Sequence, residues 1–255
     1  MIETAVDILT RDGTADGWLF EPHEEGRWPG VIHLTDIFGI RPASRDMAKR
    51  LAEQGYLVLE PNVFYRTRRP PVFDFPFKLG DERFMKRVGE LTRSLTPEAI
   101  ERDGRAYVDF LASHRSVAGE AFGVVGYCFT GAMALRLAAA CPNRIAALAS
   151  FHGGHLYADS PASPHKLLPR VRAQLYFAHG IEDRSMPKEA IEEFERALKA
   201  WGGQYVSEVY EGSRHGWTVP DNQAYDHAQA ERAFHSLAGL FRRALPGSER
   251  LHAAR

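Results

Sequence analysis

The sequence predicts an α/β fold in which a central, mostly parallel β-sheet is flanked by helices on both faces. Short apolar runs of strand length alternate along the chain with longer stretches whose apolar residues recur at helical spacing. Such alternation favours parallel pairing, because each helix carries the chain back across the sheet before the next strand. A chain of 255 residues that is 44% hydrophobic is long enough to bury a substantial core.

The expected strands are short and bounded by turn signals. The first two, residues 4–8 and 17–20, are separated by the turn signal Asp12-Gly13. Val31–Leu34 follows Pro29-Gly30 and is wholly apolar apart from one histidine, which is typical of a buried strand. The same reasoning predicts strands at residues 56–59, 122–126, 145–151, 175–178 and 205–210.

The helical stretches and one interruption complete the expected architecture. Helices are expected at residues 44–54, 97–114, 129–140, 187–200 and 223–244. Residues 66–95 begin with a run rich in proline and aromatic residues, so we expect an irregular, lid-like excursion from a single domain that spans residues 1–246. The polar residues 247–255 are expected to form a flexible tail.

Composition narrows the classes of partner. The formal net charge is −1, so no overall field would attract nucleic acid or an acidic membrane surface. No apolar run is long enough to span a bilayer, and the first residues lack the layout of a secretion signal. With two cysteines in the chain, we expect a protein of the reducing cytoplasm, either a monomer or a homodimer.

Cys128 is the strongest candidate for a reactive group. It lies between the expected strand 122–126 and the expected helix 129–140, where a sharp turn would hold it in a strained conformation. The helix N-terminus would favour the thiolate over the thiol. A free cysteine is more often a small buried hydrophobe, and that is how we interpret Cys141, which precedes Pro142 and lacks this setting.

Two further residues provide the partners that a nucleophile needs. A thiolate acts best with a base nearby and a group that orients the base. Asp183 follows the expected strand 175–178, and His215 follows the expected strand 205–210. The order of nucleophile, acid and histidine is the one that α/β-hydrolases use.

These residues and their surroundings resemble the dienelactone hydrolase (carboxymethylenebutenolidase-like) family of the α/β-hydrolase fold over nearly the full length of the chain. The resemblance implies that Cys128, Asp183 and His215 form a catalytic triad, and that the backbone N–H groups of Ile37 and Phe129 form the oxyanion hole. It implies a small-molecule ester or lactone as substrate and no cofactor. The matching stretches are residues 35–39, 54–56, 61–64, 126–128, 180–183 and 215–217.

The resemblance also suggests supporting residues, among them Tyr127 and Trp217. Family members carry an acidic residue where Asp36 stands, and it contacts the resting thiol. Asp36 is one methylene shorter than the usual glutamate, so two roles stay open for it, contact with the thiol or capping of its own loop. The family elbow often has glycine where Thr130 stands, so the turn must leave room for a branched side chain.

The substrate-binding residues depart from the family pattern. Members that cleave dienelactone hold the substrate carboxylate with arginines, and one of these positions is Val219 here. Arg87 and Arg214 are the remaining candidates in this sequence. We therefore expect neutral esters to be accepted at least as well as anionic ones.

The sequence predicts a cysteine-dependent hydrolase of esters or lactones that forms a thioester intermediate. A relative that binds a ligand without turning it over, or an acyltransferase on the same fold, remains an alternative, because fold does not determine function. His152 and His155 follow a predicted strand, where they could reach the site. No carboxylate and histidine grouping has metal-ligand spacing, so no metal is expected.

Overall fold

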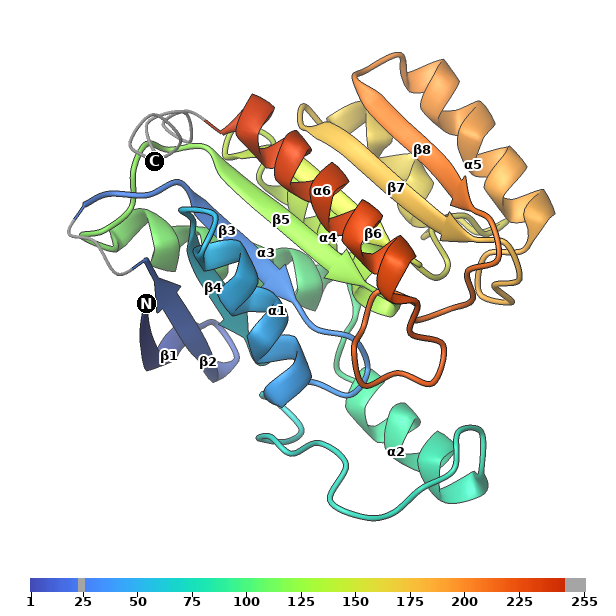
Figure 1. Ribbon diagram of the computed structural model, residues 1–255, viewed down its shortest axis with the longest axis horizontal. Coiled ribbons are helices and arrows are strands. Elements are labelled where there is room, and N and C mark those ends of the chain that lie inside the picture. Colours follow the sequence, from blue (N-terminus) through green and yellow to red (C-terminus); the bar gives the residue numbers. More distant parts are fainter. Residues whose placement is uncertain (23–25, 246–255) are drawn as a thin grey trace.

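The computed structural model describes residues 1–22 and 26–245, and its centre is an eight-stranded sheet (Figure 1). The strand order is β1-β2-β4-β3-β5-β6-β7-β8; β2 pairs antiparallel with both β1 and β4, and all the other neighbouring strands pair in parallel. This confirms the mostly parallel sheet that the sequence predicts. The strands are β1 Ile2–Thr10, β2 Gly13–Glu21, β3 Gly30–Leu34, β4 Leu57–Pro61, β5 Phe122–Tyr127, β6 Ile145–Phe151, β7 Gln174–Gly180 and β8 Tyr205–Tyr210.

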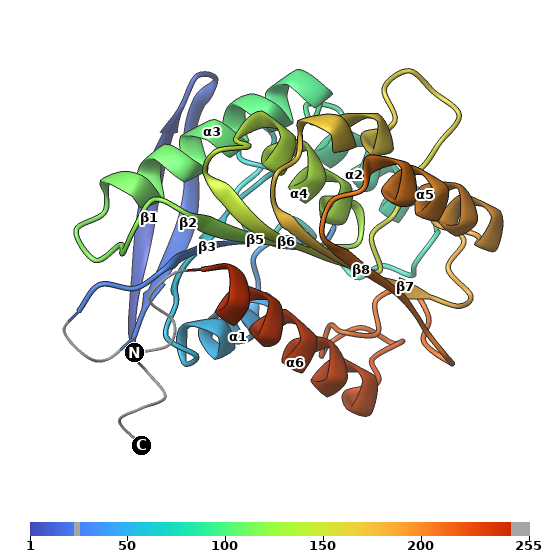
Figure 2. The ribbon, with the colours of Figure 1, turned by 90° about the horizontal axis from the view of Figure 1, so that it is seen from above.

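Helices cover both faces of the sheet. In Figure 2, α1 and α6 lie on one face, and α3, α4 and α5 lie on the other. Every residue of β3, β4 and β5 is buried, because these central strands are enclosed from both sides. The helices are α1 Pro42–Ala52, α2 Glu82–Thr92, α3 Pro97–Ser113, α4 Phe129–Ala140, α5 Lys188–Trp201 and α6 His227–Ala244, with a 3₁₀ helix at Pro164–Arg170.

The excursion at residues 66–95 differs from the expectation in one respect. Residues 82–92 are not irregular but form α2, whose N-terminus is capped by the Asp81 carboxylate accepting a hydrogen bond from the Phe84 N–H at 2.6 Å. Phe84 and Leu91 are the buried residues of this helix. The irregular part is therefore the run before Asp81, which Figure 1 shows extending away from the sheet together with α2.

The predicted tail at residues 247–255 lies outside the described residues. Within residues 1–22 and 26–245, no helix combines the length and the apolar character that crossing a membrane requires.

The order of the strands brings four loops together at one edge. β3 lies between β4 and β5, so the chain leaves β3 toward one side and later returns on the other. In open α/β sheets, ligand sites lie outside the carboxyl ends of the strands at such a switch point. The register pairs Leu34 with Gly126, Tyr127 with Phe151, and Phe151 with Ala178, so the loops after β3, β5, β6 and β7 open side by side.

Helices α3 and α4 approach closely at Gly104, which offers a test of the packing. A Cβ atom at Gly104 would lie 2.7 Å from the Leu137 side chain, whereas a Cβ at Gly89 on α2 meets nothing within 4 Å. We expect Gly104→Ala to lower the free energy of unfolding by about 1–3 kcal/mol through overpacking. Gly89→Ala should raise it by about 0.5–1 kcal/mol, because alanine is the better helix former. Urea unfolding of both variants measures this difference, and equal effects would contradict the packing.

Candidate active site

Cys128 occupies a strained turn between β5 and α4. Its φ of 59° and ψ of −134° are rare for any residue with a side chain. The turn can close because the residues at its two ends, Gly126 and Gly131, have no side chains. A Cβ at Gly126 would lie 2.3 Å from the Thr130 carbonyl oxygen, and a Cβ at Gly131 would lie 2.2 Å from Ser150 Oγ. The sharp strand-to-helix turn expected around Cys128 is therefore present.

Thr130 fits the turn and also ties it together. The side chain is fully buried, and its Oγ1 accepts a hydrogen bond from the Tyr127 N–H at 2.8 Å. The hydroxyl can donate to the carbonyl oxygen of Tyr127 at 2.8 Å or to that of Leu34 at 3.3 Å. The branched side chain thus finds room and links the end of β5 to the end of β3.

Asp183 and His215 form a short hydrogen bond at the same edge of the sheet. His215 Nδ1 lies 2.6 Å from Asp183 Oδ2. The other carboxylate oxygen accepts hydrogen bonds from the Ser185 N–H at 2.8 Å and the Ser185 hydroxyl at 2.6 Å. Burial alone would raise the pKa of Asp183, but the hydrogen bonds from His215 and Ser185 hold this pKa below its usual value. The carboxylate therefore stays charged and fixes the imidazole.

Cys128 is the second partner of His215. Burial lowers the pKa of His215, but hydrogen bonds to Asp183 and to Cys128, with the negative charges of both groups, raise it to about 10. The hydrogen bond and negative charge of Cys128 thus contribute to keeping the His215 ring protonated at neutral pH. The two cysteines differ in exposure, because Cys128 is partly exposed and Cys141 is buried. Burial raises the pKa of the Cys141 thiol.

His152 packs directly behind this pair. It is buried at the end of β6 with a φ of 41°, and its ring lies 5.1 Å from that of His215. Its Nδ1 accepts a hydrogen bond from the Cys128 N–H at 3.1 Å, and its Nε2 lies 2.8 Å from Thr218 Oγ1. Burial and the nearby charge of His215 keep the pKa of His152 well below 6.5. A neutral ring with its proton on Nε2 therefore supports the turn.

The backbone of residues 152–155 connects the loops that carry the candidate residues. The Gly154 N–H donates to the Cys128 carbonyl oxygen at 3.1 Å, and the His155 N–H donates to the Ser185 carbonyl oxygen at 3.0 Å. The loop after β6 thus binds the cysteine turn on one side and the aspartate loop on the other. Sequence reasoning noted these histidines only as residues that could reach the site.

The expected oxyanion donors, Ile37 and Phe129, follow the ends of two adjacent strands. Phe129 is the first residue of α4, where a backbone N–H has no acceptor within its own helix. Ile37 is the second residue of a turn that the Gly39 N–H closes by donating to the Asp36 carbonyl oxygen at 3.1 Å. That turn leaves the N–H of its second residue unused. Both donors follow strands that pair directly, β3 and β5.

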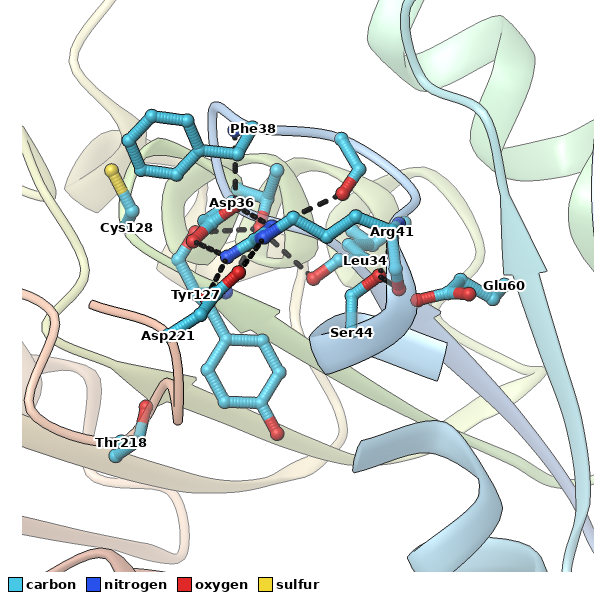
Figure 3. A network of polar contacts seen from close by, with 12 residues as sticks. Leu34, Asp36, Phe38, Arg41, Ser44, Glu60, Tyr127, Cys128, Thr218 and Asp221 are labelled. Atoms are coloured by element: carbon cyan, nitrogen blue, oxygen red, sulfur yellow. Dashed lines mark hydrogen bonds and ion pairs between the residues drawn. The ribbon is translucent and has the colours of Figure 1, made fainter. Parts of the chain in front are cut away.

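The Asp36 carboxylate is held by its own loop and by an arginine (Figure 3). It accepts two hydrogen bonds from the Arg41 guanidinium, at 2.7 and 2.9 Å, and one from the Phe38 N–H at 3.0 Å. Arg41 also pairs with Asp221 at 2.7 Å, and these hydrogen bonds and charges outweigh burial and raise the pKa of Arg41. Of the two roles left open for Asp36, these contacts are those of a loop cap.

The remaining predicted residues lie around the site rather than in it. Tyr127 is buried, and in Figure 3 its ring points away from the Cys128 sulfur. Trp217 is fully buried, and its ring lies 5.2 Å from that of His152, so it supports the ring behind Cys128. Val219 is also buried.

Arg87 and Arg214, the candidate substrate arginines, are engaged elsewhere. Arg87 donates to the Val72 carbonyl oxygen at 2.5 Å and pairs with Asp74 at 3.2 Å, so it anchors the excursion. Arg214 is exposed and pairs with Glu182 at 3.3 Å. Arg87 also pairs with Glu90 on its own helix at 3.0 Å. The contacts of Arg87 with Val72 and Asp74 were not apparent from the sequence, because these two partners lie in the irregular run.

Among residues 1–22 and 26–245, no three or more histidine, cysteine, aspartate or glutamate side chains are grouped to hold a metal ion.

The sheet, the strained turn and the carboxylate–imidazole pair together define an α/β-hydrolase fold. The sequence model of the dienelactone hydrolase family matches residues 15–245, which is most of the chain. The chain belongs to the dienelactone hydrolase family.

Individual relatives agree with this assignment. A protein of Synechocystis sp. is 27% identical over 241 residues, which cover 93% of this chain and 95% of that protein. The carboxymethylenebutenolidase of Rhodococcus opacus is 29% identical over 210 residues, covering 80% of this chain and 78% of that enzyme. A crystal structure from Klebsiella pneumoniae shares the fold with a TM-score of 0.83 at 21% identity, over 94% of this chain and 98% of that one.

The two histidines of the site should titrate very differently. In wild-type protein we expect the His215 ring resonances to shift near pH 10, whereas those of His152 show no transition above 6.5. Cys128→Ala removes a hydrogen bond and a negative charge, so the pKa of His215 should fall. Nuclear magnetic resonance of the ring protons measures both values. A His215 titration that is the same with and without the sulfur would disprove the contact.

The raised pKa of His215 makes the stability of the fold fall as the pH rises. The folded-state pKa of His215 lies above that of a free imidazole, which is about 6.5. The protonated ring therefore stabilises the fold fully below that pH, and this contribution is lost as the pH rises through about 10. Wild-type protein should lose more stability over this interval than Cys128→Ala.

Proposed function

We propose that this protein is a hydrolase of esters or lactones in which Cys128 is the nucleophile, His215 the acid and base, and Asp183 the residue that orients the imidazole. The observation that carries the proposal is the Asp183–His215 hydrogen bond of 2.6 Å beside the strained Cys128 turn, with Cys128 among the groups that raise the pKa of His215. Membership of the dienelactone hydrolase family and the carboxymethylenebutenolidase relative support the substrate class.

The first half of the reaction forms a thioester. The Cys128 thiolate attacks the carbonyl carbon, a carbon–sulfur bond forms, and the carbonyl electrons move to oxygen. The backbone N–H groups of Ile37 and Phe129 receive this oxyanion, which is a large contribution to catalysis in such sites. The intermediate then expels the alcohol oxygen, which takes its proton from the His215 imidazolium.

The second half regenerates the thiolate. His215 is now neutral and removes a proton from water as the water attacks the thioester carbonyl. The carbon–sulfur bond breaks, the acid leaves, and the thiolate returns beside an imidazolium. Asp183 keeps Nδ1 of the ring engaged, so that Nε2 faces the reacting atoms throughout.

A pair of cysteine variants tests the proposal. Cys128→Ser should lower kcat/KM for p-nitrophenyl acetate by roughly 10³-fold or more, because triad members act as a unit and the site is built around a thiolate–imidazolium pair. Cys141→Ser should leave it unchanged, since that buried thiol lies at the end of α4. Mass spectrometry of quenched wild-type enzyme should detect the acetyl group on Cys128.

Three outcomes would contradict the proposal. Full activity of Cys128→Ser would place the reaction elsewhere. Labelling of Cys128 by iodoacetamide without turnover of any ester would indicate a ligand-binding protein. Products that carry a nucleophile other than water would indicate an acyltransferase.

A further inference from the structure

We infer that an aromatic pocket beside Cys128 binds an uncharged apolar group of the ester, and that the charge arrangement in its wall disfavours substrates that carry a carboxylate. This inference rests on the proposed hydrolase function and specifies its substrate class. The pocket has a volume of about 340 Å³. Its wall is made by the loop after β3, by the irregular run of the excursion and by the loop that precedes α6.

The apolar wall consists mainly of phenylalanines. Phe38 lies 5.6 Å from Phe73 and 5.7 Å from Phe77, measured between ring centroids. Phe73 and Phe77 are 4.9 Å apart. Phe77 is 38% exposed and Leu79 is 49% exposed, although both are large apolar side chains that line the pocket. An apolar ligand would cover this surface.

Residues at two sides of the pocket adjoin the reacting groups. Phe38 directly follows Ile37, the proposed oxyanion donor, and in Figure 3 its ring points toward Cys128. On the other side, the Asn222 side chain packs so closely on Gly216 that a Cβ there would lie 2.3 Å from it. Gly216 is next to His215. A group bound in the pocket therefore adjoins a carbonyl placed between Cys128 and His215.

The polar wall offers no free positive charge. Arg41 lines the pocket, but its guanidinium is bound by two carboxylates, those of Asp36 and Asp221. These three groups carry a net charge of −1 when ionised. A carboxylate in the pocket would be repelled by the two aspartates without gaining a cation.

The first experiment compares substrates of different apolar size. Wild-type enzyme should prefer larger apolar groups in the series p-nitrophenyl acetate, hexanoate and benzoate, or in the series methyl and benzyl acetate, depending on which side of the ester enters the pocket. Phe77→Ala should lower the ratio of kcat/KM for the larger to the smaller ester by roughly three- to tenfold. Met85→Ala is the matched control, because Met85 is 53% exposed on the same excursion but does not line the pocket.

The second experiment tests the charge in the wall. Mono-p-nitrophenyl adipate and p-nitrophenyl hexanoate have the same chain length and differ in one carboxylate. Wild-type enzyme should prefer the hexanoate. Asp221→Asn leaves Arg41 with one carboxylate partner, so the ratio of kcat/KM for the adipate to that for the hexanoate should rise by roughly three- to tenfold.

The outcomes separate this inference from the proposed function. If acetate turnover depends on Cys128 but neither Phe77→Ala nor Asp221→Asn changes its ratio, the pocket assignment is wrong and the hydrolase stands. If the first experiment places the acyl side of the ester in the pocket, a wild-type preference for the adipate would also overturn the assignment. If Cys128→Ser retains full turnover, the proposed function itself is wrong.

Discussion

The strained backbone at Cys128 is the constraint on which the rest of the site depends. A residue other than glycine at a positive φ is strained, so several surrounding contacts must hold its backbone in that conformation. Here the loop after β6 accepts and donates hydrogen bonds to Cys128, and the Thr130 hydroxyl joins the turn to the end of β3. The same loop also binds the Ser185 carbonyl oxygen, and Ser185 holds the Asp183 carboxylate. One segment of backbone therefore positions both Cys128 and Asp183.

Much of this arrangement could be predicted from the sequence, because it follows from short-range patterns. Buried strands such as β3, Gly30–Leu34, are marked by apolar runs, broken here only by His33, and the fixed connection rules of parallel sheets place their ends together. Cys128, Asp183 and His215 each follow such a strand. Their order along the chain therefore predicts a shared site, and the structure places His215 Nδ1 2.6 Å from Asp183 Oδ2.

What could not be predicted depends on contacts between distant segments. The pairing of Arg41 with Asp221 spans 180 residues, and no local pattern marks it. Helix α2 differs from the expectation because the proline-rich run before it favours an irregular segment over residues 66–95, although Asp81 followed by Phe84 and Leu91 is a capped, amphipathic pattern. The neutral state of His152 is likewise a product of burial, which a single sequence does not report.

The excursion contributes none of the eight strands and none of the three proposed reacting groups, yet it supplies most of the phenylalanine wall. Arg87 fastens it through the Val72 carbonyl oxygen and Asp74, so its attachment is largely internal to the segment. Sequence drift within this stretch can therefore reshape the choice of ester while the chemistry stays intact. An unchanged reactive centre combined with an exchangeable recognition segment is a route by which one scaffold acquires new substrates without first losing its activity.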